Sequence, residues 1–306
     1  MAKMALAIHG GAGTILRSQM TAALEHEYRE GLETAIKSGW AVLEKGGSSV
    51  DAVEAAVIEL EDFPLFNAGR GSVFTHEGRN EMDAAIMDGH ALKAGAVAMV
   101  RNIRNPIRLA RQVIEKTEHI LLAGEGANQF AEMIGMHAEP DEYFFTEHRW
   151  LQLQQAMSEG RVHLDHHVAK PMGTVGAVAC DSKGHVAAAT STGGMSNKKY
   201  GRIGDSPLIG GGTYADDVCA VSCTGHGEYF MVGVSAFDVS ARMRYKNLPL
   251  EDAANETLER LTEIKGDGGL IAVDTEANCT LPFNSDGMYR GWMTDAGQLN
   301  IEIYAA

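Results

Sequence analysis

The stretch Gly173-Thr174-Val175-Gly176-Ala177-Val178-Ala179 lies just past the middle of a chain of 306 residues. It is an apolar, strand-like run that opens on Gly-Thr directly after a polar segment. Cleavage of the peptide bond before Thr174 would leave this residue with a free α-amine beside its own hydroxyl, which unites a base and a nucleophile in one residue. Taken alone, the run also fits a turn followed by a strand, so the other motifs must decide.

The polar segment, residues 152–173, is predicted to be a flexible linker, because its hydrophobic pattern dissolves and it ends near Lys170-Pro171. Imidazole and carboxylate groups suit zinc or iron, so a metal hydrolase is one alternative for this segment. A metal site needs rigidly held ligands, which a linker does not supply. The possible ligands are His163, Asp165, His166 and His167.

The composition is typical of a globular protein, with 45% hydrophobic and 22% charged residues. The formal net charge of −15 argues against binding to nucleic acid or to an anionic membrane, since both need basic patches. The N-terminal apolar run is too short for a signal peptide, and no apolar run is long enough to span a membrane. The four cysteines form no Cys-x-x-Cys pair, and Cys180 and Cys279 are interpreted as buried free thiols of a reducing compartment. The spacing of Cys219 and Cys223 could suggest a metal site, but no second pair supports it. We therefore expect a cytoplasmic protein.

Strands and helices are expected to alternate in pairs. Residues 4–9 form an apolar strand that should run into a tight turn at Gly10-Gly11-Ala12-Gly13. Residues 21–45 have helical spacing of apolar residues, and Ser48 with Asp51 resembles the capping box of a second helix. Strand pairs joined by tight turns and covered by helices favour an α+β fold with antiparallel sheets. Further strands are predicted at 82–87, 94–100, 174–180, 185–190, 218–223, 270–273, 279–283 and 300–304, and further helices at 106–116, 125–134, 228–244 and 250–264.

Three glycine-flanked groups of small polar residues follow Thr174 in the chain. Glycines allow backbone N–H groups to approach an oxyanion closely. An arginine and an aspartate three residues apart, Arg202 and Asp205, can bind the carboxylate and ammonium groups of an amino acid. Together the groups supply what amide hydrolysis by an N-terminal threonine requires. They are Thr190-Ser191-Thr192-Gly193-Gly194, Gly201-Arg202-Ile203-Gly204-Asp205-Ser206-Pro207 and Ser222-Cys223-Thr224-Gly225-His226-Gly227-Glu228.

With these three groups and Gly173-Thr174, the chain resembles the plant-type asparaginase/isoaspartyl peptidase family of N-terminal nucleophile hydrolases. The resemblance covers essentially the whole chain and also includes His9-Gly10-Gly11-Ala12-Gly13 and Phe66-Asn67-Ala68-Gly69. It implies a single domain over residues 1–306 that folds as a four-layer αββα sandwich. It further implies self-cleavage between Gly173 and Thr174 into an α subunit (1–173) and a β subunit (174–306), which assemble as a dimer of heterodimers.

The resemblance assigns the catalytic roles. Thr174 is the nucleophile, and its α-amine, with a reference pKa near 8, is the base. Thr192 hydrogen-bonds and orients Thr174. The Thr224 hydroxyl and the Gly225 N–H form the oxyanion hole, while Thr190 is interpreted as a buried strand residue.

Substrate recognition is assigned in the same way. Arg202 is expected to bind the substrate α-carboxylate, Asp205 its α-ammonium, and the backbone of Gly227 to assist at the ammonium end. The expected substrates are L-asparagine and β-aspartyl dipeptides. A protein of the same fold that stays uncut and merely binds amino acids or peptides is the alternative.

The resemblance implies no organic cofactor but a structural sodium ion. Backbone carbonyls suit such a hard cation, and Asn67, in the same loop, either lines the site or is structural. The expected ligands are the carbonyls of Leu60, Glu61, Phe63, Phe66, Ala68 and Arg70.

Overall fold

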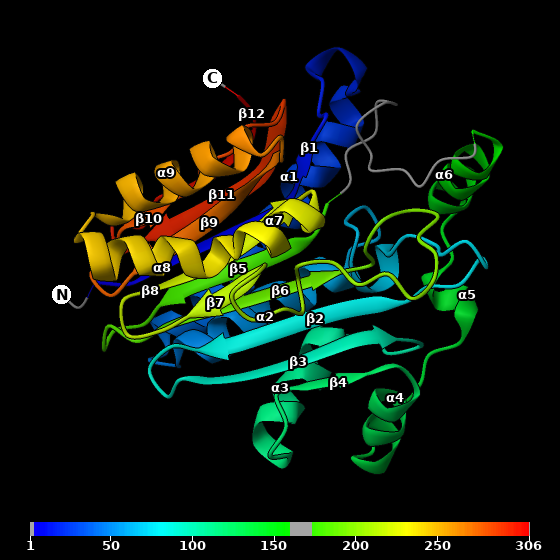
Figure 1. Ribbon diagram of the computed structural model, residues 1–306, viewed down its shortest axis with the longest axis horizontal. Helices are drawn as coiled ribbons and strands as arrows, with labels where there is room; N and C mark the ends of the chain where they lie inside the picture. Colours follow the sequence, from blue (N-terminus) through cyan, green and yellow to red (C-terminus); the bar gives the residue numbers. More distant parts are fainter. Residues whose placement is uncertain (1–2, 160–172, 306) are drawn as a thin grey trace.

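The computed structural model describes residues 3–159 and 173–305, and the histidine cluster at 163–167 lies outside them. The described residues form a mixed α/β structure with two stacked sheets (Figure 1). The larger sheet has the strand order β12-β11-β1-β5-β6-β2-β3-β4, and the smaller has the order β10-β9-β8-β7. The strands are β1 (Ala5–Gly13), β2 (Met82–Asp88), β3 (Lys93–Val100), β4 (Leu121–Ala123), β5 (Val175–Cys180), β6 (Val186–Thr192), β7 (Thr213–Ala215), β8 (Cys219–Gly225), β9 (Gly268–Asp274), β10 (Cys279–Thr280), β11 (Gly287–Thr294) and β12 (Leu299–Tyr304).

The two sheets are antiparallel throughout, except that β3 and β4 pair in parallel. β5 lies between β1 and β6, with Gly176 opposite His9 on one side and opposite Thr190 on the other. The expected tight turn at residues 10–13 is wrong, because β1 continues through Gly13 and pairs with β11. A bulge between His9 and Gly11 absorbs the irregularity, and Gly11 takes a φ of 116°, which only glycine adopts readily.

The helices cover both outer faces of the stacked sheets. α1, α2 and α3 bury their apolar sides against the larger sheet, whereas α8 and α9 cover the smaller one (Figure 1). The Ser48 hydroxyl caps α2 by accepting the N–H of Asp51 at 3.2 Å, as the capping box predicts. The helices are α1 (Ala22–Glu44), α2 (Ser49–Asp62), α3 (Pro106–Lys116), α4 (Gly124–Met133), α5 (Asp141–Phe144), α6 (Glu147–Ser158), α7 (Gly227–Gly233), α8 (Ser235–Lys246) and α9 (Leu250–Glu263), with short 3₁₀ turns at Arg17–Gln19 and Gly69–Gly71.

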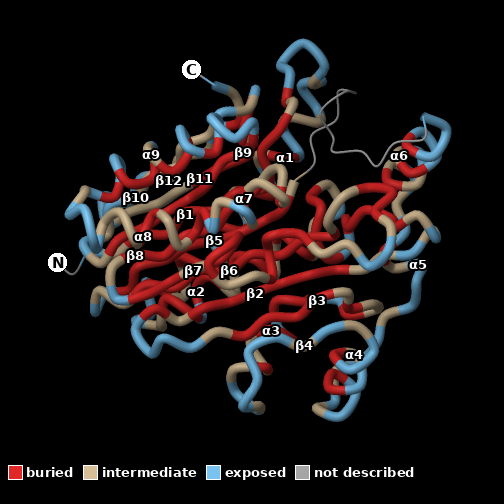
Figure 2. Tube along the Cα trace, viewed as in Figure 1, coloured by how far each residue is buried: buried red, intermediate tan, exposed pale blue. Residues whose placement is uncertain are grey.

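The two sheets pack face to face through a core of small residues. Alanines of β1, β6 and β8 meet there with Ile271 and Met288. Figure 2 shows the central strands of both sheets as buried along most of their lengths, whereas β4, β10 and β12 at the sheet edges are more exposed. Small side chains let the sheets approach closely, which brings polar residues of β1, β6, β7 and β8 into contact.

Three further predictions from the pattern are wrong. The linker does not begin at 152, because α6 continues to Ser158. The helix expected over 228–244 is divided at Val234, whose φ of 49° ends α7 and starts α8. β11 was not predicted at all, although it is a neighbour of β1 in the larger sheet. Within the described ranges, no helix is long and apolar enough to cross a membrane.

Candidate active site

The Thr174 side chain is buried directly before β5. Its hydroxyl donates to Thr192 Oγ1 at 3.1 Å, and the Ser206 hydroxyl lies 3.5 Å from Thr174 Oγ1. Thr192 ends β6, the neighbour of β5 in the sheet, while Ser206 comes from the loop before β7. Three hydroxyl groups from separate segments therefore meet at the residue that the sequence marks as the nucleophile.

The turn after β6 is fixed from two sides. Gly194 donates its N–H to Thr192 Oγ1 at 2.9 Å. The Asn67 amide donates to the Gly194 carbonyl at 2.7 Å and accepts the N–H of Val73 at 3.0 Å. Asn67 thus supports this turn through both ends of its side-chain amide.

The peptide segment before Thr174 presses against the bulge of β1. A Cβ atom on Gly173 would lie 2.4 Å from Gly11 Cα, and one on Gly11 would lie 2.6 Å from Gly173 Cα. Real Cβ contacts are never this short, so the close approach of the two backbones requires glycine at both positions. The glycines of two separate sequence motifs are explained by this one contact.

β8 ends at Thr224 and Gly225, and the Thr224 hydroxyl is a donor without a partner among the described residues. Thr224 Oγ1 is buried and makes no hydrogen bond to any described residue. An unpaired buried hydroxyl is costly and rare in folded proteins, and it is available to a ligand. Gly225 has a φ of 141°, and a Cβ there would lie 2.4 Å from the Asp267 carbonyl oxygen, so this backbone turn requires glycine.

Arg202 is paired along one edge with Glu228, at the start of α7. Its Nε donates to Glu228 Oε1 at 2.9 Å and its Nη2 to Oε2 at 2.8 Å. Burial raises the pKa of Glu228, but the hydrogen bonds and charge of Arg202 outweigh this and hold that pKa below its usual value. The sequence predicts that a substrate carboxylate pairs with Arg202 through two hydrogen bonds. On this edge of the guanidinium, Glu228 already makes such a pair.

The second edge of the Arg202 guanidinium, Nη1 with Nη2, faces glycines. A Cβ on Gly204 would lie 3.0 Å from Nη1, one on Gly194 would lie 3.6 Å from Nη1, and one on Gly227 would lie 3.0 Å from Nη2. Because these positions carry no side chains, only backbone lies against this edge of the guanidinium.

Asp205 lies beside the same edge. A Cβ on Gly227 would be 2.7 Å from Asp205 Oδ1, and Oδ2 has no hydrogen-bond partner in the described part of the chain. Burial raises the pKa of Asp205 to about 7, although the charge of Arg202 acts in the opposite direction. A buried carboxylate with an unsatisfied oxygen is suited to a cationic ligand.

Two buried residues of opposite charge, Lys198 and Asp83, lie at this end of the site. Lys198 donates its ammonium to the Glu81 carbonyl at 2.7 Å, and Asp83 accepts the N–H of Met99 at 2.8 Å. Burial lowers the pKa of Lys198 and raises that of Asp83, and the attraction between the two charges opposes both effects. A Cβ on Gly194 would lie 3.1 Å from the Lys198 ammonium, so the pair adjoins the turn that contains Gly194.

The loop expected to hold sodium, residues 60–70, is bound by a guanidinium. Arg149, which is fully buried, donates to the carbonyls of Gly71 at 2.7 Å and Leu65 at 3.1 Å. Neither carbonyl belongs to the six predicted ligands, so Arg149 and an ion would not compete for the same oxygens. Among the described residues, no cluster of three or more His, Cys, Asp or Glu side chains is placed to hold a metal.

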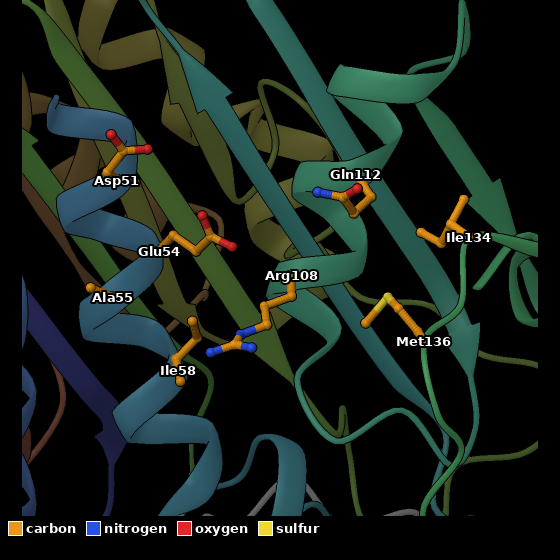
Figure 3. A pocket seen from close by; sticks show the side chains of 8 residues that line it. All are labelled: Asp51, Glu54, Ala55, Ile58, Arg108, Gln112, Ile134 and Met136. Carbon is orange, nitrogen blue, oxygen red and sulfur yellow. The ribbon is translucent and has the colours of Figure 1, made fainter. Parts of the chain in front are cut away.

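A surface pocket between α2 and α3 is separate from this site. Figure 3 shows Asp51 and Glu54 of α2 facing Arg108 and Gln112 of α3. None of the site residues described above lines the pocket.

Sequence reasoning missed several residues of the site. His9 and Ser206 contact Thr174, and Glu228 holds Arg202. All of them stand inside motifs that the sequence analysis quoted, but their partners are remote in sequence. For example, the Arg202–Glu228 pair is separated by 26 positions, and no periodic pattern links it.

The chain matches the family model described as asparaginase over residues 2–303. It is 51% identical to the isoaspartyl peptidase of Salmonella typhimurium over 299 residues, which covers 95% of this chain and 96% of the relative. The chain belongs to the asparaginase family. The isoaspartyl peptidase of Escherichia coli is 50% identical, with coverage of 95% and 93%. A probable isoaspartyl peptidase/L-asparaginase 2 of Arabidopsis thaliana is 41% identical, with coverage of 99% and 100%.

Family membership agrees with the resemblance drawn from the sequence. The motifs that carried it, among them Gly173-Thr174 and Arg202 with Asp205, are the segments that the fold gathers around the Thr174 hydroxyl. The names of these relatives, isoaspartyl peptidase and isoaspartyl peptidase/L-asparaginase, support an amidohydrolase.

Proposed function

We propose that this protein is an amide hydrolase that cuts its own chain between Gly173 and Thr174 and then hydrolyses L-asparagine and β-aspartyl dipeptides. The observation that carries the proposal is the position of the Thr174 hydroxyl. It lies 3.1 Å from Thr192 Oγ1 and 3.5 Å from Ser206 Oγ, and Ser206 directly follows Asp205. Ser206 thus adjoins both the proposed nucleophile, Thr174, and the residue proposed to bind the substrate ammonium, Asp205.

The proposed self-cleavage uses the same hydroxyl. Thr174 Oγ1 attacks the Gly173 carbonyl carbon, a C–O bond forms, the C–N bond breaks, and the nitrogen takes a proton to become the new α-amine. Water then hydrolyses the ester. The packing of Gly173 on Gly11 supports the proposal, because it holds the scissile segment against β1.

In the cut enzyme, the Thr174 α-amine accepts the proton of the hydroxyl as Oγ1 attacks the β-carbonyl of the substrate. The Thr224 hydroxyl and the Gly225 N–H stabilise the oxyanion, and the loss of one such donor costs about 10²–10³ in rate. The leaving amine departs as ammonia or an amino acid after taking up the proton. Water then releases aspartate from the ester.

Substrate binding is proposed for the edge of Arg202 that faces the glycines. The α-carboxylate would pair with Nη1 and Nη2, while the α-ammonium would lie at Asp205 near the backbone of Gly227. Glu228, on the other edge, orients the guanidinium. This grip presents the side-chain carbonyl to Thr174, which is why asparagine and β-aspartyl peptides would share a site.

We further propose the finer architecture: one αββα sandwich, cut into 1–173 and 174–306, that forms a dimer of such heterodimers in the cytoplasm without an organic cofactor. A sodium ion would bind the carbonyls of the 60–70 loop. The end of α2 supports this, since the carbonyls of a helix C-terminus carry partial negative charge.

Thr174→Ala tests the proposal, with Thr174→Ser as the matched control that keeps a hydroxyl. Wild type should give two fragments, 1–173 and 174–306, on a denaturing gel and release ammonia from asparagine. Thr174→Ala should remain one chain of 32.8 kDa without activity. Two fragments or full activity from Thr174→Ala would overturn the assignment. An uncut, inactive wild type that still binds aspartate would favour the binding-protein alternative.

A further inference from the structure

A chain of buried polar groups runs between the two sheets and ends at the backbone of Thr174. His9 Nδ1 lies 2.9 Å from the Thr174 carbonyl oxygen, and His9 Nε2 lies 2.9 Å from Ser222 Oγ. Ser222 Oγ lies 2.7 Å from Thr190 Oγ1, and the Thr213 hydroxyl lies 2.6 Å from Thr190 Oγ1. We refer to these four side chains, His9, Ser222, Thr190 and Thr213, as the brace.

The end of the brace opposite His9, Thr213, contacts the backbone of a site residue. The Thr213 hydroxyl is also 2.9 Å from the Ser206 carbonyl oxygen. The one proton of the Thr213 hydroxyl can be donated either to Thr190 Oγ1 or to the Ser206 carbonyl oxygen, but not to both. The brace therefore extends by close polar contacts from the backbone of Thr174 to the backbone of Ser206, the residue whose hydroxyl lies 3.5 Å from Thr174 Oγ1.

The directions of the hydrogen bonds nearest His9 follow from the partners of its ring. A carbonyl oxygen only accepts, so the proton of the ring must be on Nδ1. Nε2 then accepts the proton of Ser222, and the Ser222 oxygen accepts from Thr190. Burial lowers the pKa of His9 to about 3, so the ring stays neutral and keeps this single tautomer at neutral pH.

Gly176 is the second observation that points to the brace. In the larger sheet it lies between His9 on β1 and Thr190 on β6. A Cβ on Gly176 would lie 2.0 Å from Ser222 Oγ and 2.5 Å from His9 Nε2. Because Gly176 has no side chain, there is space beside it for the hydrogen bond between His9 of the larger sheet and Ser222 of the smaller sheet.

We infer that His9 is a positioning residue for the nucleophile, acting through its hydrogen bond to the Thr174 carbonyl. This inference rests on the proposed function. Thr174 lies outside the ladder of β5, which begins at Val175. After cleavage it is a chain end, and such ends fray unless their backbone is held. The donor from His9 holds that backbone, while Thr192 holds only the side chain.

Two substitutions of His9 test the contributions of its two ring nitrogens separately. The amide nitrogen of asparagine is as many bonds from Cα as His Nδ1, and that of glutamine is as many as His Nε2. His9→Asn therefore keeps the donor for the Thr174 carbonyl, and His9→Gln keeps only the reach to Ser222. His76→Gln is the matched control, because the His76 ring also makes a hydrogen bond, 2.7 Å to Asn197 Oδ1, but touches neither Thr174 nor the brace.

The readout is kcat and KM for asparagine per cut chain, with the cut fraction measured on a denaturing gel. His9→Gln should lower kcat about a hundredfold, the cost of a misplaced reacting group. Its KM should change less than about threefold, because Arg202 and Asp205 are untouched. His9→Asn should stay within about tenfold of wild type in kcat, and the control should match wild type.

Equal losses of kcat in His9→Asn and His9→Gln would overturn the inference, because packing rather than the donor would then matter. If His9→Gln stays uncut, Ser222→Ala carries the test, since it removes the hydroxyl that donates to His9 Nε2 and helps to hold the ring in place. It should lower kcat without changing KM, and an unchanged kcat would overturn the inference. Thr174→Ala, measured in parallel, distinguishes this failure from a failure of the proposed function, which would leave Thr174→Ala active.

Discussion

The pairing of Arg202 with Glu228 predicts a specific effect of Glu228→Gln: a higher KM for asparagine at nearly constant kcat. Glutamine has the shape of glutamate but replaces one acceptor oxygen with a donor. Because Nε and Nη2 of Arg202 are donors as well, at most one of the two hydrogen bonds can survive. The guanidinium is then free to turn, and its second edge no longer faces Asp205.

The magnitude follows from the exposure of the pair. The two charge-assisted bonds are 2.9 and 2.8 Å long, and the side chains are 18% and 45% exposed for Arg202 and Glu228. Solvent screens a pair with this much exposure, so the loss lies little above that of a surface pair, about 1–2 kcal/mol, or a 5–30-fold rise in KM. Arg202→Ala would also remove the proposed contact with the substrate carboxylate and should raise KM at least about a hundredfold.

The assay is the initial rate of ammonia release over a range of asparagine concentrations. Glu115→Gln is the matched control, because Glu115 accepts from Arg111 at 2.7 Å on α3, which contributes nothing to the Thr174 site. An unchanged KM in Glu228→Gln would show that the pair does not orient Arg202. A lowered KM would refute the reasoning more directly, since Glu228 would then compete with the substrate carboxylate.

Two further predictions concern buried carboxyl groups. Burial raises the pKa of Asp205 to about 7, and only the ionised form attracts an ammonium group, so kcat/KM for asparagine should rise as the pH increases through about 7. Succinamate, which lacks the α-ammonium, should show only the rise due to the Thr174 α-amine, and parallel profiles for both substrates would contradict this. Burial also raises the pKa of Glu61 from 4.5 to about 8. The protonated carboxyl group therefore stabilises the native state fully below pH 4.5, and this stabilisation is lost as the pH rises through 8. The melting temperature of Glu61→Gln should therefore fall less between pH 6 and pH 9 than that of wild type, and an equal fall would disprove the argument.

Local signals in the sequence predicted several elements well. The helix expected at 106–116 is α3, which begins at Pro106, a residue favoured at the first helical position. The strand at 174–180 was recognised because a buried apolar run follows a polar segment, and it is β5. Thr190 lies buried in β6, as its apolar neighbours indicate.

Features that depend on distant partners were not predictable. β1 was expected to end at His9, but its glycines continue the strand because Gly11 packs on Gly173, far along the chain. The hydrogen bonds of His9 join residues 165 and 213 positions apart, and neither spacing has a local signature. The register that places Gly176 between His9 and Thr190 is set by sheet pairing, which a single sequence does not specify.

The strand order explains why the proposed cut would not separate the two pieces. β1 and β2 belong to residues 1–173, whereas β5, β6 and β11 belong to residues 174–306. In the larger sheet, strands of one piece lie between strands of the other: β1 is paired with β11 on one side and with β5 on the other, and β2 is paired with β6. Separation would have to open three ladders at once, together with the buried core on both faces of the sheet. Breaking one peptide bond therefore changes the chemistry of Thr174 while leaving the scaffold that positions it intact.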